Sequence, residues 1–147
     1  MSAESPPENH DQSPEEALFA GQIHGLVATF YQNERPPRGL AGRLDWYFHG
    51  AISRQLQNGA ISGAAGECVY LPIQRNQATY HLLLLGSGEV KSPGRRGEIS
   101  QSNLLILKKN LSSLKWKTTG VSRADFGNLA NHALENSLKG VHLWIGT

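Results

Sequence analysis

The sequence lacks the features that many enzymes and membrane proteins require. It contains a single cysteine, Cys68, so it can form neither an intrachain disulfide nor a zinc site of the CxxC type. The six histidines show no HxxxH or HxxH spacing. The longest aliphatic runs, residues 82–85 and 104–107, are far shorter than the roughly 20 apolar residues that span a bilayer. We therefore expect no metal site and no membrane helix.

The first 16 residues lack both an apolar stretch and any Lys or Arg, which argues against a secretory signal and predicts a cytoplasmic protein. They hold five of the 12 acidic residues, so the rest of the chain has seven acidic residues against all 14 basic ones, a net charge of +7. This asymmetry predicts a disordered acidic tail over residues 1–19 and a folded basic domain over residues 20–147.

What is present is an alternation of strand and helix patterns. Strands are predicted where β-branched, leucine and aromatic residues cluster, at residues 26–31, 68–73, 79–85, 116–121 and 141–145. The four leucines at 82–85 indicate a central strand that is buried on both faces. These elements predict an α/β fold with a mostly parallel, mixed central sheet of about five strands and helices on both faces.

Three helices are predicted between the strands. Apolar residues spaced by four, from Leu40 to Leu56, predict one continuous helix that ends at Asn58-Gly59. A second helix is predicted over residues 99–114. The third should run from Asp125, as its N-cap, to Leu138.

No catalytic motif is complete. Ser87 lies between two glycines, but Leu85 and Glu89 stand where a G-x-S-x-G nucleophile elbow needs glycine. Lys91 stands where a dinucleotide-binding G-x-G-x-x-G would need its third glycine. Cys68 lies in an apolar strand, where a thiol usually behaves as a small hydrophobic group. The sequence therefore predicts no catalytic residue and no cofactor.

One loop has the composition of an anion site. It follows the central strand and precedes the second helix, and ligands of open α/β sheets bind beyond the carboxyl ends of the strands. Backbone amides at a helix N-terminus also attract anions. The alternative is a basic loop whose glycines serve only the turn. The candidate ligand-binding residues are Gly86, Ser87, Gly88, Lys91, Arg95 and Arg96.

Three consecutive motifs carry a family resemblance. An I-S-x-x-L-x-x-G pattern ends the first helix at 52–59, a G-x-x-G-E-x-x-x-L-P pattern covers 63–72, and the leucine strand closes in G-x-G at 86–88. This order resembles the N-terminal domain of the leucyl aminopeptidase family, peptidase family M17. The resemblance implies a macro-domain-like, three-layer α/β fold. That family's metal ligands and catalytic residues belong to a separate domain with an N-T-D-A-E-G-R-like signature, which this sequence lacks, so the resemblance implies a protein that is not an enzyme.

Three functions remain open at this point. The first is a non-catalytic scaffold or regulatory module that binds another protein or itself. The second, implied by the macro-like fold, is binding of ADP-ribose or a related nucleotide by the loop at residues 86–97. The third is salt-sensitive DNA binding by the basic body, although its basic residues are scattered along the sequence.

Overall fold

The computed structural model describes residues 7–90 and 97–147. Within these residues the centre of the molecule is a six-stranded sheet with the strand order β1-β6-β5-β2-β4-β3. All neighbouring strands are parallel except β3 and β4, which form an antiparallel hairpin. The strands are β1 (Glu8–Asn9), β2 (Gly25–Phe30), β3 (Cys68–Arg75), β4 (Ala78–Gly86), β5 (Thr119–Ser122) and β6 (Leu143–Gly146). The predicted mixed, mostly parallel sheet is confirmed, with the two-residue β1 as an additional strand.

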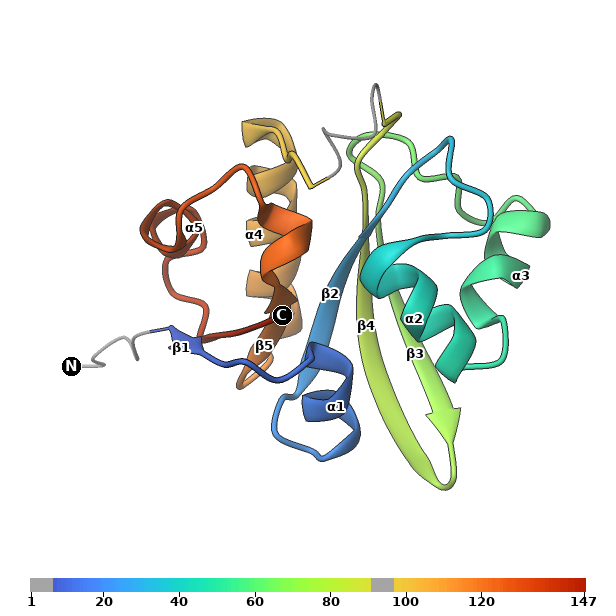
Figure 1. Cartoon of the computed structure of the whole chain (residues 1–147), viewed down its shortest axis with the longest axis horizontal. Helices are drawn as coiled ribbons and strands as arrows, with labels where there is room; N and C mark the ends of the chain where they lie inside the picture. The colour runs from blue at the N-terminus through green and yellow to red at the C-terminus, as the bar shows by residue number, and fades with distance from the viewer. Residues whose placement is uncertain (1–6, 91–96) are drawn as a thin grey trace.

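Helices cover both faces of the sheet (Figure 1). One face carries α1 (Pro14–Phe19), α2 (Gly39–Tyr47) and α3 (Ala51–Gln57). The other carries α4 (Gln101–Leu114), the 3-10 helix η2 (Arg123–Phe126) and α5 (Asn131–Ser137). None of the helices in the described part of the chain is long and apolar enough to cross a membrane.

The central strands divide the interior into two hydrophobic cores. Leu82 and Leu84 point into the core under α2 and α3, whereas Leu83 and Leu85 point into the core under α4. All four leucine side chains are at most 1% exposed. Because successive side chains of a strand alternate between faces, the leucine run does mark a strand that is buried on both sides, as predicted.

The predicted continuous helix from Leu40 to Leu56 is wrong. The chain leaves the helical conformation between α2 and α3, where His49 and Gly50 have φ angles of 54° and 81°. Asp45, on α2, then caps α3: its carboxylate accepts hydrogen bonds from the Ser53 N–H (2.8 Å) and the Ser53 hydroxyl (2.5 Å). The spacing of four between apolar residues correctly indicated which residues are buried. The same spacing fits two short helices that pack on one core and one long helix.

The predicted start of ordered structure at residue 20 is too late. β1 pairs in parallel with β6, and Ser13 caps α1 by accepting the Glu16 N–H. Glu15 is only 3% exposed and forms an ion pair with Arg43 of α2. Glu15 therefore serves as a buried partner within the fold and is not part of a solvated tail. Residues 1–6 of the predicted tail lie outside the described part of the chain.

Asp125 is not the N-cap of a long third helix. The segment forms the short η2 and then, after a break, α5, with Ser122 and Ala130 at the N-cap positions. The Asp125 side chain is 1% exposed, and its Oδ2 accepts the backbone N–H of Thr29 at 3.1 Å. This aspartate therefore ties η2 to the carboxyl end of β2.

Removing the cap of α3 tests this account of the broken helix. We expect Asp45→Ala to lower the free energy of unfolding by about 1 kcal/mol, because the first turn of α3 loses its side-chain acceptor. Urea denaturation measures this change. Asp11→Ala, at an exposed position, is the control and should stay within about 0.5 kcal/mol of the wild type. Equal effects of the two substitutions would contradict the capping role of Asp45.

Candidate functional site

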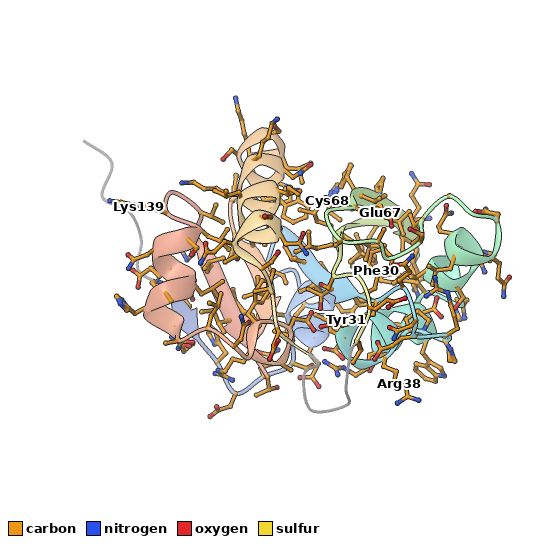
Figure 2. All side chains as sticks on the ribbon, turned by 90° about the horizontal axis from the view of Figure 1, so that it is seen from above. Phe30, Tyr31, Arg38, Glu67, Cys68 and Lys139 are labelled. Atoms are coloured by element: carbon orange, nitrogen blue, oxygen red, sulfur yellow. The ribbon has the colours of Figure 1, made fainter. Side chains whose placement is uncertain are left out.

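A pocket of about 340 Å³ opens at the carboxyl ends of β2 and β4, beside the N-terminus of α4. Figure 2 looks onto this edge of the sheet and shows Tyr31 near the middle of the molecule, between Phe30 and Arg38. The pocket is lined by Tyr31, Ala65, Ser87, Glu89, Glu98, Ile99, Ser100, Asn103 and Asn128. It thus lies at the edge of the sheet where the sequence predicts a ligand.

The glycines after β4 serve close packing against the loop before β3. A Cβ atom on Gly86 would lie 2.2 Å from the carbonyl oxygen of Ala64. The Gly88 N–H donates to the Gly63 carbonyl at 2.8 Å, and Gly88 has a φ of +78°. Gly86 therefore needs glycine for the close approach, and Gly88 needs it for its positive φ.

Ser87, between these glycines, contributes a polar group without a partner. Its backbone N–H donates to the Phe30 carbonyl at 2.9 Å, which joins the ends of β4 and β2. Its Oγ is buried, lines the pocket and has no hydrogen-bond partner among the described residues. A buried polar atom of this kind costs free energy until something hydrogen-bonds to it, so Ser87 marks a place for a ligand atom or a water.

The opposite wall of the pocket is held by two side chains that the sequence analysis did not select. The Tyr31 hydroxyl accepts the N–H of Gly97 at 2.8 Å. The Asn128 amide accepts the Ile99 N–H at 3.0 Å and donates to the Ile99 carbonyl at 3.1 Å. Residues 97–99 are thereby fixed to β2 and to the segment after η2. No sequence motif marks Asn128, because its partner lies 29 residues away.

The N-terminus of α4 forms the floor next to Ser87. Ser100 is the N-cap and accepts the Asn103 N–H at 3.1 Å, while the Asn103 side chain donates to the Gly86 carbonyl at 3.0 Å. The other N–H groups of the first helical turn have no partner within the helix. They also carry the positive end of the helix dipole, so this end of the pocket favours a negatively charged group.

The charged side chains that line the pocket are acidic. Glu89 and Glu98 are both exposed, and the described lining includes no Lys or Arg. Lys91, Arg95 and Arg96 of the candidate loop lie outside the described residues, so their role stays a prediction. Of the three glycine-loop residues that the structure does describe, Ser87 alone lines the pocket.

Two other kinds of site are conceivable for this chain, a reactive cysteine and a metal centre. Burial raises the pKa of the Cys68 thiol to about 11, so the thiol stays protonated at neutral pH and is a poor nucleophile. Among the described residues, no three His, Cys, Asp or Glu side chains are grouped so that they could hold a metal ion.

The close approach at Gly97 allows a direct test of the pocket wall. A Cβ there would lie 2.4 Å from the Ala124 carbonyl oxygen, whereas a Cβ on Gly140, with nearly the same positive φ, would meet no atom within 4 Å. We expect Gly140→Ala to cost about 1–2 kcal/mol from backbone conformation alone. Gly97→Ala should cost a further 1–3 kcal/mol, roughly, from overpacking. Urea denaturation of both variants gives the difference, and equal losses would refute the close packing of residue 97 against η2.

No model of a known protein family matches the sequence, and a comparison with curated proteins finds no match. Among solved structures, the macrodomain of DarG from Mycobacterium tuberculosis is similar with a TM-score of 0.67 and 12% identity, over 98% of each chain. The macrodomain of Thermus aquaticus DarG gives a TM-score of 0.63 and 14% identity, over 95% of this chain and 97% of the other.

A leucine aminopeptidase is also similar. The tomato enzyme, solved as a K354E mutant, gives a TM-score of 0.60 and 15% identity, over 100% of this chain and 33% of the aminopeptidase. The similarity agrees in fold with the resemblance seen in the sequence motifs. At such low identities these comparisons establish the fold and no more. The chain has a macrodomain-like α/β fold with a six-stranded, mostly parallel sheet.

Proposed function

We propose that this protein binds ADP-ribose, or a closely related nucleotide, in the pocket at the carboxyl ends of β2 and β4. The observation that carries the proposal is the buried Ser87 Oγ, which lines this pocket without a hydrogen-bond partner among the described residues. The macrodomain-like fold supports it, because a pocket at this edge of a mostly parallel sheet is where such folds accept ligands.

The chemistry of the lining favours a ligand that has both sugar and phosphate groups. The N–H groups in the first turn of α4, which have no partner within the helix, suit phosphate oxygens. The carboxylates of Glu89 and Glu98 would accept hydrogen bonds from ribose hydroxyls, and they would repel a bare polyphosphate. The volume of about 340 Å³ is in the range of small-molecule sites, about 300–1,000 Å³.

The proposed role is binding without catalysis. A serine hydroxyl needs an adjacent general base to act as a nucleophile, and the Ser87 Oγ makes no hydrogen bond to any described side chain. Ser87 is therefore proposed to recognise the ligand. A hydrogen bond from the ligand to its Oγ would recover about 1–3 kcal/mol that the unsatisfied group now costs.

Isothermal titration calorimetry with ADP-ribose tests this proposal. We expect Ala65→Trp, which places a large ring at the exposed rim of the pocket, to weaken binding at least tenfold. Ala60→Trp is the matched control, because Ala60 is also exposed but does not line the pocket. Pyrophosphate should bind much more weakly than ADP-ribose, because the carboxylates of Glu89 and Glu98 repel it and it has no ribose hydroxyl to donate to them.

Absence of heat with ADP-ribose, ADP and AMP at millimolar concentration would exclude the proposal. So would an Ala65→Trp variant that binds ADP-ribose as tightly as the Ala60→Trp variant. Tighter binding of pyrophosphate than of ADP-ribose would instead indicate a simple anion site.

A protein-binding role is the second candidate, and one observation favours it. Trp46 on α2 is 76% exposed and stands beside a shallow hollow of about 450 Å³ lined by Pro37, Gly39 and Gly42. Tryptophan is enriched among the residues that contribute most to protein interfaces. The hollow would accept an apolar side chain of a partner or of a second copy of this chain.

Light scattering coupled to size exclusion distinguishes self-association through this surface. We expect any dimer to dissociate more readily, by at least tenfold in dissociation constant, after Trp46→Ala. Leu105→Ala on α4 is the control, since Leu105 is 68% exposed but lies on the other face of the sheet. A strictly monomeric protein at high concentration would remove the self-association form of this candidate.

A further inference from the structure

We infer that a second surface, at the opposite end of the sheet from the pocket, binds single-stranded nucleic acid by stacking bases on exposed rings between lysines. We call this surface the aromatic-lysine patch. It consists of His24, Tyr70, His81, Lys115, Trp116 and Lys117. The inference is independent of the proposed nucleotide site.

The patch forms where the amino ends of β2 and β5 meet the β3–β4 hairpin. His81 of β4 is paired with Gly25 of β2 and with Pro72 of β3. The Trp116 ring lies directly over Gly25, since a Cβ there would be 2.6 Å from the ring. The tip of the hairpin projects beyond the helices in Figure 1, and Tyr70 on β3 is exposed.

The rings of the patch hold one another in place. The Tyr70 hydroxyl is hydrogen-bonded to His81 Nδ1 at 2.5 Å, and the two ring planes are within 8° of parallel. The Trp116 ring meets Tyr70 edge-on at 6.4 Å, and His24 meets His81 edge-on at 5.4 Å. Tyr70 is nevertheless 41% exposed. A ring that is oriented in advance loses little conformational freedom when a base stacks on it.

The charge around these rings is of one sign. Lys115 and Lys117 flank Trp116 and are both exposed. The chain segments that build the patch, residues 20–33, 68–88 and 99–124, contain no Asp or Glu. The pKa of His24 is lowered, first by burial and then by electrostatic interaction with His81 and Lys117. The patch therefore attracts a polyanion.

The shape of the patch favours nucleic acid over an acidic peptide. An extended peptide would add to the free edge of β3, but Pro72 interrupts that edge because it has no N–H to donate. The lysines would pair with carboxylates as well as with phosphates, but the flat faces of the rings offer a carboxylate side chain no stacking partner. Every nucleobase, in contrast, has a face that stacks on such rings.

Fluorescence anisotropy with a labelled oligothymidylate of about 20 nucleotides tests the inference. We expect Tyr70→Leu to weaken binding at least fivefold, because one stacked base is worth about 1–3 kcal/mol. Trp46→Leu is the control, as it removes a ring on α2 that is more exposed than Tyr70, 76% against 41%, and is not part of the patch. Thermal unfolding of each variant establishes that the fold is retained.

The lysines are tested through the salt dependence of the affinity. Lys115→Asn suits the positive φ of 54° at this position, and Lys117→Gln removes the second charge. We expect each to reduce the slope of log K against log salt by about 0.7. Lys139→Gln is the control: Lys139 is exposed and is not part of the patch, so its replacement should leave the slope unchanged.

Four results would overturn the inference, the last of them competition with ADP-ribose. The first is no binding at about 50 mM salt, where phosphate contacts are strongest. The second is an equal loss of affinity in Tyr70→Leu and Trp46→Leu. The third is binding of a polyglutamate peptide that is as tight and as dependent on Tyr70, which would point to an acidic protein partner. Saturating ADP-ribose should leave oligonucleotide affinity unchanged, and competition between them would refute a separate site.

Discussion

The pairing of β2 with β4 is the interaction on which the rest of the structure depends. Six consecutive residue pairs, from Gly25 with His81 to Phe30 with Gly86, align these strands in parallel at the centre of the sheet. β2 and residues 82–86 of β4 are buried, so the two strands separate the two cores and support helices on either side. The same register also determines which residues lie next to each other at each end of the sheet. Tyr31 and Ser87 leave the strands side by side at the pocket, and His81 lies next to Gly25 under the Trp116 ring.

The two ends of this strand pair have opposite chemistry. At the carboxyl end, the described lining offers carboxylates, an unpartnered hydroxyl and the positive end of a helix. At the amino end, rings and lysines are exposed on segments that carry no acidic residue. A small molecule with sugar and phosphate groups suits the first end, and a flexible polyanion with flat bases suits the second. The near-neutral total charge of +2 conceals this separation.

Much of the architecture was predictable because burial leaves a pattern in the sequence. The leucine run and the alternation of strand and helix patterns led to the right fold class. They also placed the candidate loop after the central strand, at the edge of the sheet where the pocket opens. Errors arose where a pattern has two structural solutions. A spacing of four in apolar residues fits one helix or two short helices on the same core. The two-helix arrangement is the one in which the Asp45 carboxylate accepts the Ser53 N–H. An acidic segment in the sequence resembles a solvated tail, and only the folded structure shows that Glu15 forms an ion pair with Arg43.

The sequence by itself determined the α/β class, the burial of the central strands and the absence of a complete catalytic motif, because these depend on local periodicity and residue type. Only the tertiary structure decided which polar groups share a cavity and which rings share a surface. Tyr31 contacts Gly97 across 66 residues, and Lys117 contacts His24 across 93. Such contacts are set by strand order and register, and no local pattern in the chain encodes which distant segments will meet.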